Sequence, residues 1–259
     1  YKKEQDGIEY PNLTINGGTF TGGINTIKND DNATLTIKNG TFKNYTQSAF
    51  QNHHIARIEG GTFDGANVYA VLNCGVCSSA VTGHDNHETT ITGGKFNGTI
   101  SQTVGKITIL GGTFSSDVSS YCAENYAAEN NGNNTYTVKP LKDVAVAQIE
   151  ENGFYKTIEA AVNVAKNGAT ITLLKDTTED VTVPSKKNIT LDLNGKKLTN
   201  VSNNTITIEN GAELTVTDNG TGTGTVDNVT HGKSAIYNKG TAILENGIFD
   251  RSKEAGKNA

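Results

Sequence analysis

Four residues between positions 74 and 88 have the types and the spacing of a metal site. Cys74, Cys77, His84 and His87 form the pattern C-x2-C-x6-H-x2-H. Two thiolates and two imidazoles suit tetrahedral zinc, although both the gap between the pairs and the His-x2-His spacing are shorter than usual. Three other interpretations stay open: a Cys74–Cys77 disulfide in an exported protein, small buried residues at a corner of the fold, and ordinary loop histidines. We expect no cofactor, with zinc as the alternative to test; Cys122 is the odd cysteine.

The sequence supports acid–base catalysis less than it supports a metal site. Asp30 and Asp31 are the adjacent acidic pair, and they stand in a stretch that is typical of a turn. Exposed carboxylates in a turn are usually solvated, whereas an acid–base couple needs two carboxyl groups facing one substrate. His84 and His231 stand beside glycines as isolated histidines, and the serines of the chain have no nucleophile-elbow context. We therefore expect no catalytic residues and a protein that is not an enzyme.

Composition excludes two further classes of function. The net charge is −5, and arginine occurs only at Arg57 and Arg251, so the chain has no basic stripe for nucleic acid. No apolar run approaches the roughly 20 residues of a membrane span, so we expect no membrane insertion of this chain. Methionine is absent, and we expect a fragment of a larger exported protein.

A six-residue phrase recurs along the chain and indicates what holds these residues. The phrase is INGGTF at 15–20, IKNGTF at 37–42, IEGGTF at 58–63, ITGGKF at 91–96, ILGGTF at 109–114 and LENGIF at 244–249. A second landmark is an Asn that closes a short apolar run, at Asn29, Asn52, Asn73 and Asn238. One unit is about 21 residues long, and a period of 20 to 50 residues indicates a repeat architecture.

The repeats predict an all-β fold, a right-handed parallel β-helix with coils of about 21 residues. Short alternating runs such as LTI at 13–15 and 35–37 are typical of strands, and Gly and Asn suit the corners between them. Equivalent residues of successive coils then lie above one another. We expect Phe20, Phe42 and Phe63 to form an internal stack, and Asn29, Asn52 and Asn73 to form a hydrogen-bonded ladder.

The phrase is lost in residues 121–138, which divide the chain. We expect residues 1–139 to be the C-terminal part of a first β-helix with its closing cap at 115–138. Residues 140–259 would be the N-terminal part of a second β-helix that opens with a short capping α-helix near 157–167, where apolar residues recur at helical spacing and Thr157 suits the N-cap. One continuous solenoid with an interruption is the alternative.

The residues around this division carry a resemblance. GGTF, DVSSY and YTV, followed by YKTIEAAVNVAKNGATITLLKD and NITLDLNGKKLT, resemble pectate-lyase-like β-helix repeats in large surface proteins of Gram-positive, often gut-dwelling bacteria. The resemblance implies an extracellular, cell-surface protein of the adhesin or immunoglobulin-binding type. The same scaffold carries polysaccharide lyases and hydrolases. Their clustered carboxylates are not matched here, and RIE at 57–59 departs from the RIK-like element of the hydrolases.

The chain departs from its period between Asn73 and Phe96, where about twelve residues are extra. Loops that leave a rigid repeat are common sites of binding specificity. His53, His54, Tyr45 and Tyr69 in the variable stretches and the 74–88 insertion are the candidate binding residues, and the plainer interpretation is exposed turn residues. We expect a monomeric, non-catalytic binding module for a host or neighbouring-cell protein or glycan. A structural stalk and a polysaccharide-active enzyme are the alternatives.

Overall fold

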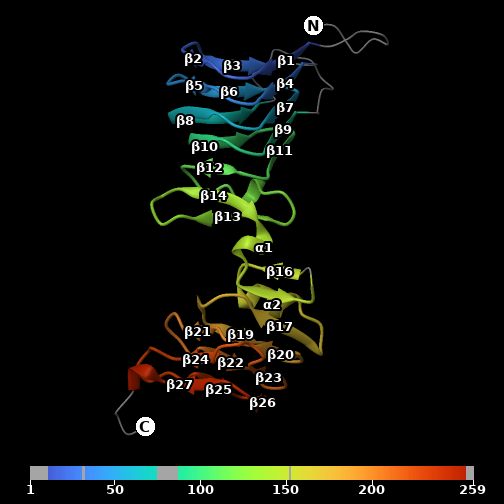
Figure 1. The fold of residues 1–259 in the computed structure, drawn as a ribbon, viewed down its shortest axis with the longest axis vertical. Helices are drawn as coiled ribbons and strands as arrows, with labels where there is room; N and C mark the ends of the chain where they lie inside the picture. Colours follow the sequence, from blue (N-terminus) through green and yellow to red (C-terminus); the bar gives the residue numbers. More distant parts are fainter. Residues whose placement is uncertain (1–10, 31–32, 75–86, 152, 255–259) are drawn as a thin grey trace. The chain divides into compact units, whose positions relative to one another are not determined.

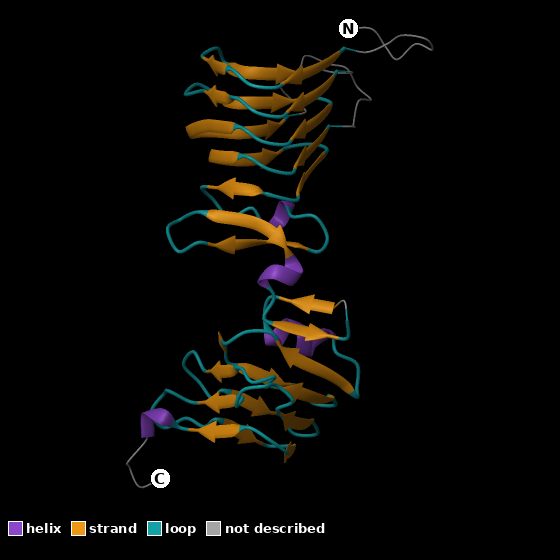
Figure 2. Ribbon diagram, viewed as in Figure 1, coloured by secondary structure: helices purple, strands orange, loops and turns teal. Residues whose placement is uncertain are grey.

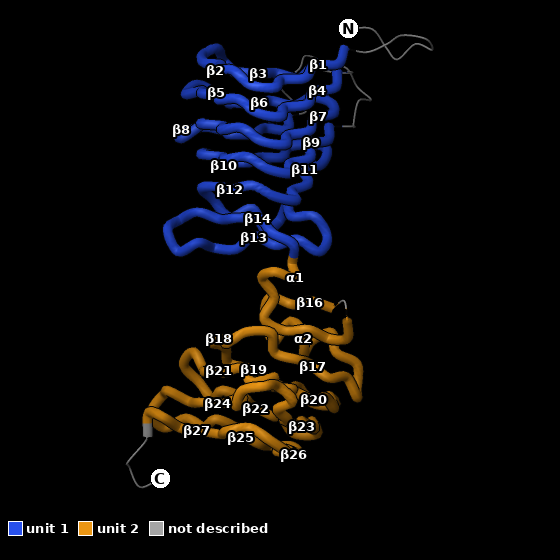
Figure 3. Tube along the Cα trace, in the orientation of Figure 1, with its two compact units in different colours: residues 1–140 blue, residues 141–259 orange. Residues whose placement is uncertain are grey.

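The computed structural model describes residues 11–30, 33–74, 87–151 and 153–254. The chain forms two compact units, residues 1–140 and 141–259 (Figure 3). The predicted all-β class is confirmed, because parallel sheets dominate both units and helices are few and short (Figure 2).

One sheet of unit 1 takes one strand from each repeat. Its strands, in order across the sheet, are β1(Asn12–Ile15), β4(Thr34–Ile37), β7(Ile55–Ile58), β9(Glu88–Ile91) and β11(Lys106–Ile109) (Figure 1). All neighbours pair in parallel, and the last residue of every strand is an isoleucine that pairs with the isoleucine of the next repeat. These isoleucines are buried, since alternation in a strand sends every second side chain to the core face.

Seven further strands of unit 1 pair in parallel within a second sheet. They are β2(Thr19–Thr21), β3(Asn25–Asn29), β5(Thr41–Lys43), β6(Ser48–Asn52), β8(Thr62–Asn73), β10(Lys95–Gln102) and β12(Gly112–Phe114). The predicted phenylalanine stack is confirmed and continues beyond Phe63. Its four successive ring pairs, Phe20–Phe42, Phe42–Phe63, Phe63–Phe96 and Phe96–Phe114, have centroids 4.7–5.1 Å apart and planes within 14° of parallel.

The glycine before each of these phenylalanines is required by the stack. Gly40 has a φ of +138°, and a Cβ there would lie 2.9 Å from the ring of Phe42. Gly18, Gly61, Gly94 and Gly112 have the same left-handed backbone. Only glycine adopts this conformation without strain, so the Gly and the Phe of the phrase form one structural device.

The expected asparagine ladder is present in a modified form. Nδ2 of Asn29 donates to Oδ1 of Asn52 over 2.8 Å, and both residues are buried. Asn52 and Asn73 are connected through Thr89, whose hydroxyl accepts from Asn52 at 3.0 Å and donates to Asn73 at 2.6 Å. The fourth landmark, Asn238 in unit 2, is exposed, and its side-chain carbonyl accepts from the N–H of Gly240.

Unit 1 closes with antiparallel strands in the segment where the repeat phrase is lost. After η1(Ser119–Tyr121), β13(Tyr126–Asn130) and β14(Tyr136–Pro140) form a hairpin, and β14 pairs antiparallel with β12. The hairpin thereby covers the edge at Phe114, which is 1% exposed. The expected cap at 115–138 thus takes the form of a hairpin, which ends the row of parallel strands.

Unit 2 begins earlier than its predicted helix. α1(Leu141–Val144) precedes a hairpin of β15(Ala147–Ile149) and β16(Gly153–Tyr155), and only then follows α2(Ile158–Val164). The helix predicted at 157–167 is therefore shorter, because the chain turns to extended backbone at Ala165. Lys187 Nζ donates to the Ala165 carbonyl and, over 3.1 Å, to that of Asn163.

The N-cap of α2 uses one predicted residue and one that was not predicted. Oγ1 of Thr157 accepts from the N–H of Ala160 at 3.0 Å, as the sequence indicates. The carboxylate of Glu179 accepts from the N–H groups of Ile158 and Glu159, both at 2.8 Å. Together these two side chains bind three of the N–H groups that a helix start leaves without intrahelical partners.

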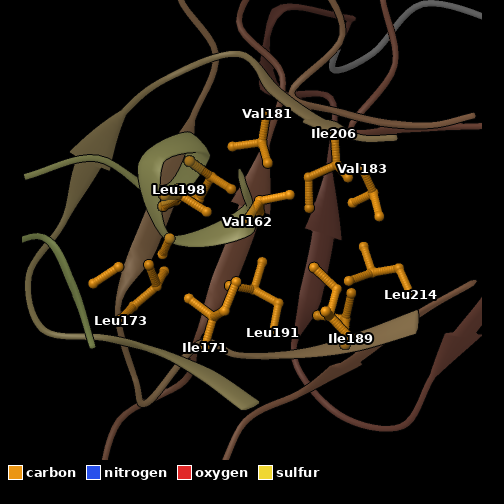
Figure 4. Packing of buried hydrophobic residues seen from close by; sticks show 14 of the residues in the cluster. Val162, Ile171, Leu173, Val181, Val183, Ile189, Leu191, Leu198, Ile206 and Leu214 are labelled. Carbon is orange, nitrogen blue, oxygen red and sulfur yellow. The ribbon is translucent and has the colours of Figure 1, made fainter. Parts of the chain in front are cut away.

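The rest of unit 2 forms three sheets around one core. The strands are β17(Ala169–Leu173), β18(Thr177–Thr178), β19(Val181–Val183), β20(Asn188–Asp192), β21(Lys197–Thr199), β22(Ile206–Ile208), β23(Glu213–Thr217), β24(Thr225–Asp227), β25(Ile236–Asn238), β26(Thr241–Leu244) and β27(Ile248–Asp250), followed by η2(Ser252–Glu254). Parallel pairs join β17-β20-β23-β26, β18-β21-β24-β27 and β19-β22-β25. Figure 4 shows Val162 of α2 within the core, together with Leu191 of β20 and Val181 of β19.

Candidate functional site

The proposed metal residues fall partly outside the described residues, where Cys77 and His84 lie. Cys74 is 3% exposed and disulfide-bonded, whereas Cys122 is not in a disulfide. A disulfide sulfur is not the thiolate that zinc binds, so Cys74 in this state offers no zinc ligand. Over the described ranges, no group of three His, Cys, Asp or Glu side chains could hold a metal ion.

Three of the sequence candidates meet at one buried corner of unit 1. His53 follows Asn52 and Cys74 follows Asn73, and the N–H of Cys74 donates to the carbonyl of Asn52 at 3.3 Å. The rings of His53 and His87 lie edge to face with centroids 5.8 Å apart. His53 is 0% exposed and His87 5%, so neither offers the surface contact that we expected of His53.

His54 is held by the backbone of the preceding repeat. Its Nδ1 lies 3.1 Å from the carbonyl of Ala33, and its own carbonyl accepts from Nδ2 of Asn52 at 2.8 Å. The side chain is half-buried. These contacts give His54 a clear role in joining adjacent repeats.

The two tyrosine candidates are on the surface, beside a pocket that the sequence did not reveal. Tyr45 is 68% exposed and Tyr69 36%. The N–H of Tyr69 donates to the carbonyl of Gln47 at 3.0 Å, and Gln47 lines a pocket of about 630 Å³. Ile24, Asn25, Lys28 and Gln51 form the rest of its lining.

Amide side chains line this pocket in an ordered way. Nδ2 of Asn25 donates to Oε1 of Gln51 at 2.6 Å, which joins β3 to β6. Gln51 is 1% exposed, and its Nε2 has no hydrogen-bond partner among the described residues. Ile24 is 67% exposed and gives the rim an apolar side chain. The signal available in the sequence was weak, because Asn25 and Gln51 are 26 positions apart and belong to different repeats.

The strongest electrostatic features of unit 2 hold turns in place. The N–H of Gly224 lowers the pKa of Asp218, and with the N–H groups of Gly195 and Gly220 this effect outweighs the burial that raises it. Burial also raises the pKa of Asp227, but hydrogen bonds from Lys197 and Ser252 outweigh it, so the pKa is lowered. Both carboxylates are thus held ionised by groups of their own unit, which is typical of structural carboxylates.

The acidic pair and the RIE element do not form an acid–base site in the described structure. Asp31 lies outside the described residues, and Asp30 forms an ion pair with Lys28 at 2.6 Å. Arg57 binds Glu59 at 2.8 Å, and both side chains are at least one-third exposed. Asp30, Arg57 and Glu59 therefore each have a local partner of opposite charge.

Comparison of the chain with protein-family models, with curated proteins and with solved structures gave no match. No helix in the described part of the chain is long and apolar enough to cross a membrane.

Proposed function

We propose that both units are parallel β-helices of right hand, with coils near 21 residues that lengthen where loops are inserted. The support is the register of unit 1, in which the same isoleucine, glycine and phenylalanine positions pair through five successive repeats. In unit 2 the pairing follows the same plan with more varied spacing, as the row Ile171, Leu191, Val216 and Leu244 illustrates.

On this scaffold we propose a non-catalytic binding module of an extracellular bacterial surface protein. The observation that carries the proposal is the pocket of about 630 Å³ in unit 1, which the exposed Ile24 and the amides of Asn25 and Gln47 line. The exposed Tyr69 donates its backbone N–H to the Gln47 carbonyl, and the exposed Tyr45 stands two residues before Gln47. Tyrosines next to hydrogen-bonding amides are typical of surfaces that bind proteins or glycans. Host or neighbouring-cell proteins are the partner class, with immunoglobulin and mucosal glycoproteins tested first.

Two other functions predict different results. A stalk that only supplies length needs no such surface. A polysaccharide-active enzyme needs a base and carboxylates that face one cleft. A sugar-release assay on pectins, mucin glycans and glycosaminoglycans tests the enzyme directly, since turnover would replace the binding proposal.

The binding proposal is tested by immobilising the chain and measuring retention of purified immunoglobulin and purified mucin. We expect one of them to be retained, and retention to fall at least about tenfold in the double variant Tyr45→Ala/Tyr69→Ala, because buried tyrosines often dominate interface energy. Tyr237→Ala removes an exposed tyrosine of unit 2 and is the matched control. Retention of neither probe, or equal retention by both variants, contradicts the proposed site.

A further inference from the structure

A second pocket, of about 490 Å³, lies where unit 1 closes, beside β11 at the edge of the five-stranded sheet. Gln102 and residues 106–108 and 110 form one side of it, and residues 120–124 with Tyr126 form the other. The structure describes the chain continuously from 87 to 151, so neither end of the sequence leaves this space open. Pockets of about 300–1,000 Å³ are the size that holds small ligands.

The pocket exists because the chain leaves the path of a regular repeat at this point. The N–H of Ala123 donates to the carbonyl of Ile109 at 2.9 Å, as a further parallel strand would. Continued backwards in that register, the N–H of Tyr121 would donate to the carbonyl of Ile107. It donates instead to the carbonyl of Val118 at 2.9 Å, at the turn of η1. This turn therefore leaves the edge of β11 uncovered at Ile107.

The carbonyl of Ile107 is consequently an acceptor without a donor. Lys106 and Leu110 donate their N–H groups to the preceding repeat, so the alternating backbone turns the groups of Ile107 toward the pocket. The N–H of Ile107 donates to Oε1 of Gln102 at 2.7 Å. No group of the described residues donates to its carbonyl, although Ile107 is only 3% exposed. Buried carbonyls are normally paired, so this one indicates a ligand in the pocket.

The rest of the lining combines donors, acceptors and an aromatic ring. Gln102 uses its Oε1 for Ile107, which leaves the two N–H groups of its Nε2 to the pocket side. Lys106 and Glu124 are exposed at the pocket and bring an ammonium and a carboxylate. Tyr126 is half-buried and adds an apolar ring with a hydroxyl. The pocket thus suits a ligand that is polar at its edges and apolar on one face.

We propose that this pocket binds one or two sugar rings of a glycan. A sugar hydroxyl both donates and accepts, so neighbouring hydroxyls serve the Ile107 carbonyl and the Gln102 amide together. The C–H face of a sugar ring packs on an aromatic ring such as that of Tyr126. An added peptide strand fits less well, because it needs the N–H of Ile107 that Gln102 already holds. An inorganic anion fits less well because Glu124 brings a negative charge.

The site is separate from the surface proposed above for protein binding. That surface belongs to the first repeats, at Ile24 and Gln47, whereas this pocket lies at the last strand of the same unit. The two proposals can therefore fail independently. The Tyr45→Ala/Tyr69→Ala variant should bind sugar as the natural chain does.

The thiol of Cys122 provides a direct measure of whether the pocket is filled. Cys122 lines the pocket, is half-buried and is in no disulfide. Its labelling by iodoacetamide is measured without reductant, in lactose, cellobiose or diacetylchitobiose at up to about 30 mM, because a single small site binds with a Kd of about 1 mM. We expect at least one sugar to slow the labelling at least about threefold, since an occupied pocket excludes the reagent. Sorbitol, an open-chain polyol, is the control and should have no effect.

Variants assign the protection to this pocket. In Lys106→Ala and in Glu124→Ala, the sugar concentration that halves the labelling rate should rise at least about fivefold, because each change removes a hydrogen-bonding group. Lys95→Ala is the matched control, at an exposed lysine of β10 outside the pocket. Each rate is compared with that of the same variant without sugar, because charges near a thiol change its reactivity.

Circular dichroism checks that each variant is folded, and peptide mass mapping checks that the label is on Cys122. Labelling that none of the three sugars slows overturns the proposal. Protection that is equally strong in Lys106→Ala, Glu124→Ala and Lys95→Ala also overturns it, because the sugar would then bind elsewhere.

Discussion

The side-chain amide of Asn29 donates to the side-chain carbonyl of Asn52 across 2.8 Å, and both groups are buried. Nδ2 of Asn52 also donates to the carbonyls of His54 and Glu88 and to the hydroxyl of Thr89. Asn52 therefore joins three repeats through one amide. No apolar residue of similar volume could serve these partners.

We expect Asn52→Ala to destabilise unit 1 strongly, since each buried partner left unsatisfied costs about 1–3 kcal/mol. Urea denaturation followed by circular dichroism measures the loss, and hydrogen exchange assigns it to unit 1. Asn238→Ala changes the fourth landmark asparagine, which is exposed, and should alter stability by less than about 0.5 kcal/mol. Equal effects of the two changes would contradict the role given to the buried amide.

The phenylalanine row supports a second prediction. Phe63 is wholly buried between Phe42 and Phe96, so Phe63→Ala removes two ring contacts and leaves a cavity. We expect a loss of about 3–5 kcal/mol, measured by urea denaturation. Phe20→Ala is the matched control because Phe20 has one ring neighbour and is half-buried. A loss at Phe20 as large as that at Phe63 would argue against stacking as the cause.

The lowered pKa values of Asp218 and Asp227 give a pH dependence of known sign. A carboxyl whose pKa is lower in the folded state stabilises that state fully above its unfolded pKa, near 3.8, and loses this contribution as the pH falls through the folded pKa. We therefore expect the urea concentration at the unfolding midpoint of unit 2 to decrease once the pH drops below about 4.

Asp218→Asn separates this effect from general acid denaturation. The variant lacks the charge that the N–H groups of Gly195 and Gly224 bind, both at 2.6 Å, so it should be less stable at neutral pH. Its difference from the natural chain should shrink as the pH falls, because the natural carboxyl becomes protonated. A difference that is constant from pH 7 to pH 2 would show that shape and not charge is responsible.

The cysteine chemistry gives a prediction that distinguishes the disulfide from zinc. The chain has three cysteines, of which Cys74 is disulfide-bonded and Cys122 is in no disulfide. Thiol titration of the unfolded chain without reductant should therefore find one thiol per molecule. Three thiols together with stoichiometric zinc in the purified protein would restore the metal hypothesis for Cys74, Cys77, His84 and His87.

Residue spacing was enough to predict the rows of unit 1. Phe20, Phe42 and Phe63 recur with the same preceding glycine, and a regular period places equivalent residues in register. β21 and β24 were not predicted, because three-residue strands such as Lys197–Thr199 have too few positions to show alternation. The hairpin that opens unit 2 was missed for a similar reason, since β15 and β16 also have three residues each.

Long-range polar contacts were beyond prediction at the candidate site. Thr89 bridges Asn52 and Asn73, although the insertion lies between these asparagines and Thr89 in the sequence. Glu179 caps α2 although it stands 20 residues after Glu159. The pocket beside Tyr69 depends on amides from two repeats. Each case needs the register of the neighbouring repeat, which the phrase fixes only near its own glycines and phenylalanine.

The pairing of every unit 1 repeat with its immediate neighbours has a mechanical consequence. A pulling force that separates β1 from β4 acts along the hydrogen bonds between these strands and not along the strands themselves. The hydrogen bonds therefore open one after another. The first repeat can then detach while the later ones keep their own partners. The repeat from Phe20 to Phe42 spans 22 residues, and its detachment releases about 75 Å of extended chain. Unit 1 would therefore lengthen in steps under tension and limit the peak force on whatever it holds.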